Sequence, residues 1–130
     1  MSAIAIRSLK RAASRQPGLR LLLLHGSRAR GEETHHSDWD IAYLADERFD
    51  PDAFRAALVQ LLGTEHIDLV DLARAGAQLR FRAARDGQVA FASDEQVYPR
   101  FWHEAVSFWC DAGAILRRGY ADILESLTRS

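Results

Sequence analysis

Short apolar runs recur along the first three-quarters of this 130-residue chain and predict a small β-sheet. Residues 19–25 form a compact, mainly apolar run between two glycines, which is typical of a buried strand. Apolar or alternating runs at 38–44, 67–72 and 89–91 indicate further strands. The pattern therefore predicts a mixed sheet of about four strands.

The segments between these runs carry apolar residues at helical spacing. Residues 4–13 place apolar side chains on one side of a helix and basic side chains on the other, and Pro17-Gly18 is expected to end that helix. Pro51 favours the start of a second helix, which ends at the following glycine, and a third helix is predicted over 75–85. This order of elements predicts an α/β (α+β) fold in which helices lie mainly on one face of the sheet.

The end of the chain is expected to be one long helix. Starting at Pro99, aromatic and aliphatic residues fall on a single stripe, and the helix would extend roughly 40 Å at about 1.5 Å per residue. We expect the line through Phe101 and Trp109 to face the core. The Trp102 side either packs there too or meets a partner protein.

Length and composition fit one domain with its own core. The chain is 48% apolar and 27% charged, and we expect a single domain made of the sheet with its helices (1–93) and the C-terminal helix (94–130). The net charge is −1, and no block of like charge runs along the chain. Stable nucleic-acid binding is therefore not expected, because such binding needs many phosphates to be neutralised at once.

Cysteine content and apolar run length bear on the compartment. The single cysteine, Cys110, excludes an internal disulfide and fits a reducing compartment. Residues 1–16 contain no continuous apolar stretch typical of a signal peptide, and the longest apolar run, 21–24, is too short to cross a bilayer. We therefore expect a cytoplasmic protein that does not bind membranes.

Candidate chemistry is concentrated between Gly26 and Asp40. Gly26 ends the first strand at a sharp turn, where the backbone can come close to a ligand. Ser27 follows at an expected helix start, where free N–H groups and the helix dipole favour a phosphate. Asp38 and Asp40 are two residues apart, so on a strand both carboxylates point to the same face. Paired carboxylates repel each other unless a cation lies between them, and oxygen ligands suit Mg²⁺.

The strand at 67–72 offers a third carboxylate, from Asp68 or from Asp71. The two aspartates point to opposite faces of the strand, and their spacing leaves the choice between them open. Asp71 is also suited to capping the helix that follows. Beside the first pair, either aspartate would complete a site for two metal ions, which can stabilise the attacking and leaving oxygens of an in-line phosphoryl displacement.

The motif Gly-Ser-x-Ala-Arg-Gly at 26–31, followed by Ser-Asp-x-Asp-Ile at 37–41, resembles the minimal nucleotidyltransferases of the DNA polymerase beta-like nucleotidyltransferase superfamily. The resemblance covers roughly the first three-quarters of the chain and is closest around these two motifs. It implies the nucleotidyltransferase fold. It also implies that the first aspartate of the third strand, Asp68, is the metal-binding and catalytic partner of Asp38 and Asp40.

The resemblance further implies contacts to the nucleotide. Gly26 and Ser27 would bind the triphosphate. Arg30 would either contact the triphosphate as well or form ion pairs with Glu32, Glu33 and the aspartates, and both interpretations remain open.

The activity that the resemblance implies is Mg²⁺-dependent transfer of AMP from ATP to an acceptor hydroxyl, with two metal ions and release of pyrophosphate. Many minimal members are antitoxins that pair with a HEPN-domain ribonuclease toxin, and some adenylylate a tyrosine of that toxin. We therefore expect a protein adenylyltransferase with a HEPN toxin as partner.

Two alternatives to this function remain. One is a catalytically weak or inactive nucleotide-binding antitoxin that acts by steric occlusion. The other is a transferase for a small molecule such as an aminoglycoside, although those enzymes generally carry an additional domain.

Overall fold

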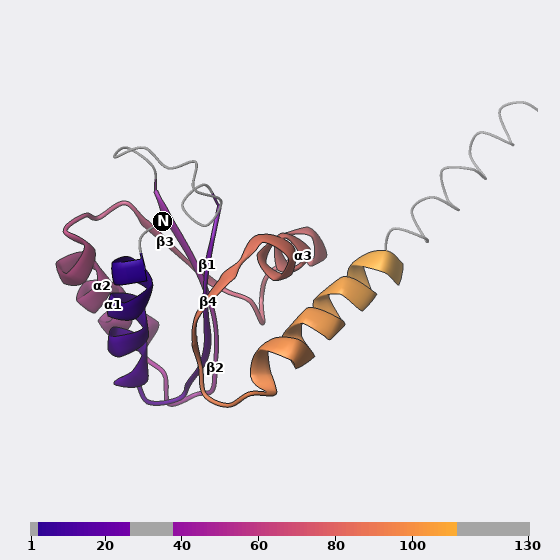
Figure 1. Cartoon of the computed structure of the whole chain (residues 1–130), viewed down its shortest axis with the longest axis horizontal. Helices are drawn as coiled ribbons and strands as arrows, with labels where there is room; N and C mark the ends of the chain where they lie inside the picture. The colour runs from indigo at the N-terminus through magenta and orange to yellow at the C-terminus, as the bar shows by residue number, and fades with distance from the viewer. Residues whose placement is uncertain (1–2, 27–37, 112–130) are drawn as a thin grey trace, which may run out of the picture.

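The computed structural model describes residues 3–26 and 38–111. Within them, the strands are β1 (Leu19–His25), β2 (Trp39–Ala45), β3 (Ile67–Asp71) and β4 (Gln88–Ala92), and the helices are α1 (Ala3–Ser14), α2 (Pro51–Leu62) and α3 (Ala77–Asp86). Residues 97–111 form a further helix after β4 (Figure 1). The strands and helices predicted for this part of the chain are confirmed, with small shifts at their ends.

The strands of the described residues form one mixed sheet in the order β3-β2-β1-β4. Strand β1 is antiparallel to both β2 and β4, whereas β2 and β3 are parallel. A parallel pair needs a crossover connection, and α2 supplies it between β2 and β3. This topology places the C-terminal end of β1 beside the N-terminal ends of β2 and β3.

Local sequence fixes both ends of α2. The carboxylate of Asp50 accepts hydrogen bonds from the backbone N–H groups of Asp52 and Ala53 at 3.1 and 3.2 Å, and Pro51 occupies the first turn. At the other end, Gly63 adopts a left-handed conformation with φ of 68°. These caps set where the crossover helix begins and ends.

Helices cover both faces of the sheet (Figure 1). Helices α1 and α2 pack on the face that carries Leu22 and Leu24, whereas α3 and the 97–111 helix pack on the face that carries Leu21 and Leu23. The fold class is confirmed, but the expectation of helices mainly on one face is corrected. The reason is the unbroken apolar run of β1. Its successive side chains point to opposite faces, and all four leucines are fully buried, so each face must be covered.

The helix after β4 combines a buried side with an exposed one. Phe101 is 2% exposed, as predicted, and Trp109 stacks on Phe81 of α3 with a ring-centroid distance of 5.4 Å. Trp102 and Phe108 are 45% and 61% exposed. The helix therefore packs on the sheet along one stripe and leaves large apolar side chains in solvent.

Some predictions fall outside the described residues. They concern the turn and loop at 27–37, which include Ser27 and Arg30, and the continuation of the last helix over 112–130. The division of one domain into 1–93 and 94–130 stays a prediction. None of the helices in the described part of the chain is long and apolar enough to cross a membrane.

Candidate active site

Three polar residues lie side by side across the sheet. His25, at the end of β1, is paired with Asp40 of β2, and Asp40 is paired with Asp68 of β3. Directly paired residues point their side chains to the same face, so these three form one row, on the face that α3 covers. The neighbouring positions Leu24 and Ile41 point to the other face and are fully buried.

A cavity of about 250 Å³ opens over this row, between the sheet and α3. Its lining residues are His25, Gly26, Asp40, Asp68, Leu79, Arg82 and Asp86. The three residues of α3 are spaced i, i+3 and i+7, which places them on one side of the helix. The sheet therefore supplies two carboxylates to the cavity, and the helix supplies one guanidinium and one carboxylate.

Gly26 allows the backbone to approach Asp40 closely. Its φ is +76°, a conformation that favours glycine. A Cβ atom built on Gly26 would overlap the Oδ2 atom of Asp40 and would lie 2.9 Å from its Cγ atom. A side chain at this position would therefore displace the carboxylate, so the glycine of the predicted motif has a steric role beside Asp40.

His25 is the buried polar residue of the row, with 8% of its surface exposed. Its Nε2 atom has no hydrogen-bond partner among the described residues. Burial lowers the pKa of His25 from its ordinary value of 6.5, while the charges of Asp40, Asp68 and Asp86 act in the opposite direction. Because burial is the largest influence, the imidazole is held in its neutral form near neutral pH.

Asp68 and Asp71 have different surroundings, although both belong to β3. Asp68 lines the cavity beside Asp40. Asp71 is paired with Tyr43 on the opposite face, and its Oδ1 accepts a hydrogen bond from the N–H of Ala73 at 2.9 Å. Its other carboxylate oxygen lies 3.8 Å from the Nε atom of Arg74. The structure therefore brings Asp68 to Asp40, whereas Asp71 caps the turn that follows β3.

Asp38 is placed differently from Asp40. It lies directly before β2, its side chain is 64% exposed, and its Oδ1 is 3.8 Å from the Nδ1 atom of His66. It is not among the residues that line the cavity. Within residues 3–26 and 38–111, no three His, Cys, Asp or Glu side chains are grouped closely enough to hold a metal ion. The structure thus brings together two of the three predicted carboxylates.

The Asp40–Asp68 pair suits a magnesium ion that shares its ligands with a substrate. Mg²⁺ usually takes one or two carboxylates from the protein and completes its octahedral shell with water and substrate phosphates. Two adjacent carboxylates without a cation also repel each other. The donor set in the cavity therefore fits Mg²⁺ bound together with a phosphate ligand better than a metal bound by protein alone.

Sequence reasoning did not select His25, Leu79, Arg82 and Asp86 as site residues, although they line the cavity. The three residues of α3 share one side of a predicted helix, which was the signal available in the sequence. The side that faces a site depends on how the helix packs on the sheet, and spacing along the chain does not determine that packing. Conversely, Ser27 and Arg30 belong to the expected site but lie outside the described residues.

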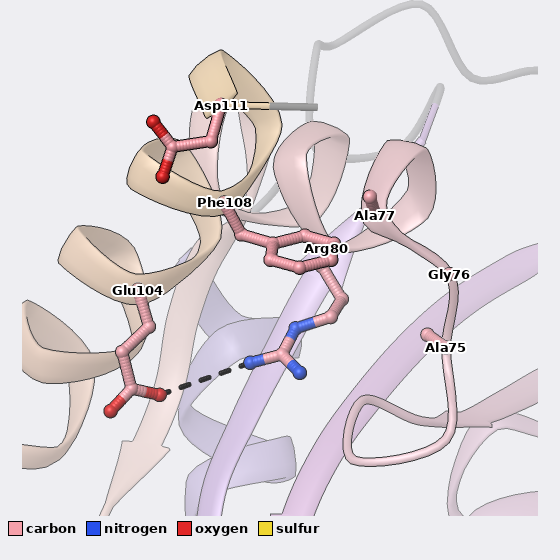
Figure 2. Close-up of a pocket in the computed structure, with 7 residues that line it drawn as sticks. All are labelled: Ala75, Gly76, Ala77, Arg80, Glu104, Phe108 and Asp111. Atoms are coloured by element: carbon pink, nitrogen blue, oxygen red, sulfur yellow. Dashed lines mark ion pairs between the residues drawn. The ribbon is translucent and has the colours of Figure 1, made fainter. Parts of the chain in front are cut away.

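A larger cavity of about 690 Å³ lies between the start of α3 and the 97–111 helix. Figure 2 shows Arg80 reaching toward Glu104, and the two side chains approach to 3.9 Å. Phe108 and small residues before and at the start of α3 form much of the remaining wall (Figure 2). Neither Asp40 nor Asp68 lines this cavity. The carboxylate chemistry therefore belongs to the smaller cavity.

Comparison with known proteins identifies the class to which this fold and carboxylate row belong. Residues 7–96 match the family model described as Polymerase beta, Nucleotidyltransferase, and the chain therefore belongs to that family of nucleotidyltransferases. The family expected from the Gly-Ser and Asp-x-Asp motifs is confirmed.

Among individual proteins, the chain is similar to the protein adenylyltransferase MntA of Aphanizomenon flos-aquae (strain 2012/KM1/D3). The two are 30% identical over 103 residues, which cover 70% of this chain and 69% of that protein. It is also similar to a crystal structure of a toxin–antitoxin with AMP-PNP, with a TM-score of 0.75, 24% identity and coverage of 92% of this chain and 98% of that one. A third similar structure is a tri-AMPylated Shewanella oneidensis HEPN toxin in complex with its MNT antitoxin, with a TM-score of 0.70, 23% identity and coverage of 95% and 99%. At these identities, the structural matches show a shared fold.

Proposed function

We propose that this nucleotidyltransferase uses Mg²⁺ to transfer AMP from ATP to a hydroxyl group of a protein acceptor, and that the acceptor is a HEPN-type toxin which it neutralises as an antitoxin. The observation that carries the proposal is the placement of Asp40 and Asp68 as direct neighbours on two strands, facing one cavity beside the Gly26 turn. The cytoplasmic location expected from the sequence belongs to the same proposal.

Each residue of the row has a distinct part in the proposed reaction. The acceptor hydroxyl releases its proton to solvent and its oxygen forms a bond to the α-phosphorus of ATP. The bond from that phosphorus to the bridging oxygen of the β-phosphate breaks, and pyrophosphate leaves. Asp40 and Asp68 would hold Mg²⁺, which supplies charge neutralisation on the phosphate oxygens. Gly26 leaves space for the carboxylate of Asp40. The buried neutral His25 adds no charge to the row at neutral pH.

The remaining predicted residues keep their proposed roles. Ser27 and Arg30 follow Gly26 in the chain and are proposed to contact the triphosphate. Asp38 is proposed as the third carboxylate, since it precedes Asp40 by two positions and its side chain is largely in solvent. Because Asp38 is exposed to water, it can bind a metal ion that arrives with the nucleotide. Such an Mg²⁺ ion needs only one or two protein carboxylates.

The acceptor is proposed from the similar proteins and from one surface of this chain. The relative from Aphanizomenon flos-aquae is named a protein adenylyltransferase, and the Shewanella oneidensis structure holds an AMPylated HEPN toxin with an MNT antitoxin. The chain itself exposes Trp102 and Phe108 on the helix after β4, and exposed aromatic side chains are common in protein interfaces. A protein acceptor accords with both observations.

The proposal is tested by incubating the purified protein and its co-expressed partner with Mg²⁺ and ATP labelled on the α-phosphate. We expect label on the partner, and we expect its mass to increase by AMP units. Asp40→Asn and removal of divalent cations by a chelator should each abolish the transfer. Asp94→Asn, a change at an aspartate that does not line the cavity, should leave it unchanged. Equal labelling with Asp40→Asn would refute the proposed chemistry.

The exposure of Asp38 favours a second candidate function. If the third carboxylate stays beside His66 and out of the cavity, the chain would bind nucleotide and neutralise its partner by steric occlusion. The double variant Asp38→Asn, Asp40→Asn separates the two functions. Occlusion predicts that this variant still neutralises the toxin in cells, whereas adenylyl transfer predicts that toxicity returns.

A further inference from the structure

We propose that Arg82 of α3 binds the phosphate chain of the nucleotide from the side of the cavity opposite the Asp40–Asp68 pair, and so makes the site selective for triphosphates over monophosphates. This inference rests on the proposed function, because it assigns a ligand contact within the same cavity. It concerns a residue that neither of the sequence motifs contains.

The packing of α3 places Arg82 at the site. Leu79, Arg82 and Asp86 form one stripe along the helix, and all three line the cavity with the sheet carboxylates. The buried residues Ala83 and Ala84 anchor the adjacent side of the helix in the core. The cavity therefore has an acidic wall on the sheet and a wall on α3 that presents a guanidinium group.

Arg82 is the permanent cation among the lining residues. The carboxylate of Asp86 already has a partner, since both of its oxygens accept hydrogen bonds from Arg85 at 2.9 Å. Arg85 also lies over the Phe81 ring, 5.5 Å from its centroid. Arg82 forms no ion pair with any residue in the described part of the chain, and it is exposed to solvent. Its guanidinium is therefore available to a ligand.

The charge distribution of the cavity identifies the chemistry of that ligand. A ligand that binds beside Asp40 and Asp68 through Mg²⁺ is itself negatively charged. The two carboxylates repel the part of this charge that Mg²⁺ does not neutralise. A planar guanidinium matches two phosphate oxygens with parallel N–H donors. The reacting α-phosphate belongs at the carboxylate wall, so Arg82 on the facing helix is placed for the pyrophosphate portion that leaves.

The test compares the affinities of ATP and AMP for the full-length protein and its variants in Mg²⁺, by equilibrium titration without turnover. We expect Arg82→Gln and Arg82→Ala to weaken ATP binding about tenfold, because a charge-assisted hydrogen-bonded contact is lost. AMP binding should change less than about twofold, since AMP has no β- or γ-phosphate. Arg82→Lys should recover part of the ATP affinity, because it keeps the charge without the fork geometry.

Arg11→Ala is the matched control, since Arg11 is an exposed arginine of α1 on the opposite face of the sheet. It should bind both nucleotides like the wild type. Equal ATP affinity in Arg82→Gln and the wild type would overturn the inference while leaving the proposed function intact. A parallel loss of ATP and AMP affinity would also overturn it, since that result indicates a general structural role. If the wild type binds no ATP, the proposed function itself fails.

Discussion

The two faces of the sheet are built from neighbouring rows of the same strands, yet one is a closed core and the other holds the site. On the face covered by α1 and α2, Leu24 pairs with Ile41, and both are fully buried. The next pair in the same ladder is His25 of β1 with Asp40 of β2, and their side chains point to the opposite face. Asp40 is in turn paired with Asp68 of β3. A step of one residue thus separates hydrophobic packing from the carboxylate row of the candidate site.

This difference follows from how completely each face is covered. Helix α3 and the 97–111 helix pack on Leu21 and Leu23 in the middle of the site face, and a cavity remains at the end of the strands. The carboxylates lie beyond the apolar contacts that these helices make, so they remain accessible to solvent and ligands. Charged groups require such access because burying an unpaired charge is costly. The same alternation that builds the core therefore delivers paired carboxylates to an open position.

The largest expected effect on stability concerns the closed face. Phe54 of α2 is fully buried, and its ring lies 5.5 Å from that of Phe49 in an edge-on arrangement. Phe54→Ala should lower the free energy of unfolding by about 3–5 kcal/mol, since it leaves a cavity in the core. Phe108→Ala, on the site face and 61% exposed, should change it by less than about 0.5 kcal/mol. Denaturant titration measures the unfolding free energy of both variants. Similar losses in the two variants would contradict the expected difference between the two positions.

A smaller loss of stability is expected when either of two glycines is replaced, and a loss of activity is expected at one of them. Gly26 and Gly63 both have positive φ, so replacement by alanine should cost each about 1–2 kcal/mol of unfolding free energy. A Cβ at Gly63 meets no atom within 4 Å, whereas at Gly26 it would strike the carboxylate of Asp40.

Only Gly26→Ala should therefore impair the proposed adenylyl transfer, by about a hundredfold, since small displacements of a reacting group have effects of this size. Thermal melting curves and initial rates of the two variants provide the measurement. An equal loss of activity in Gly63→Ala would show that general destabilisation, rather than contact with Asp40, is responsible.

The smallest effect concerns the pH dependence of stability. Burial lowers the pKa of His25 in the folded state below its ordinary value of 6.5. Between these two pKa values the unfolded chain binds more protons than the folded protein, so the unfolding free energy rises with pH. The contribution of His25 is complete above about pH 6.5 and is lost as the pH falls through the folded-state pKa.

In the presence of a chelator, His25→Asn should have a shallower rise of unfolding free energy with pH than the wild type. An unchanged slope in His25→Asn would show that the imidazole is not held neutral by its surroundings.

The elements of the fold were largely predictable because their signals are local. The leucine run of β1, the Pro51 start of α2 and the glycine that ends it each act within a few residues. The coverage of both faces was missed, although four consecutive buried leucines already require it. The sequence pattern indicates which strand positions are buried, but it does not indicate which helix packs on each face.

The site was predictable only in part because its assembly depends on register and packing. The Gly-Ser turn and Asp-x-Asp spacing indicated Gly26 and Asp40, and the family resemblance favoured Asp68 over Asp71. The register of β2 and β3 places Asp68 beside Asp40. The exposed position of Asp38 and the presence of Arg82 on the facing helix depend on side-chain conformation and helix packing, which motif spacing does not encode.

We propose that Asp40 and Asp68 together bind the divalent cation used for nucleotidyl transfer. Asp68→Asn and Asp71→Asn form the most direct test, since they make the same change on one strand, on opposite faces. Mg²⁺ is titrated calorimetrically into each variant saturated with a non-hydrolysable ATP analogue. Asp68→Asn should weaken Mg²⁺ binding by about tenfold or more, whereas Asp71→Asn should bind Mg²⁺ like the wild type. Wild-type Mg²⁺ affinity in Asp68→Asn, or a greater loss in Asp71→Asn, would contradict this proposal.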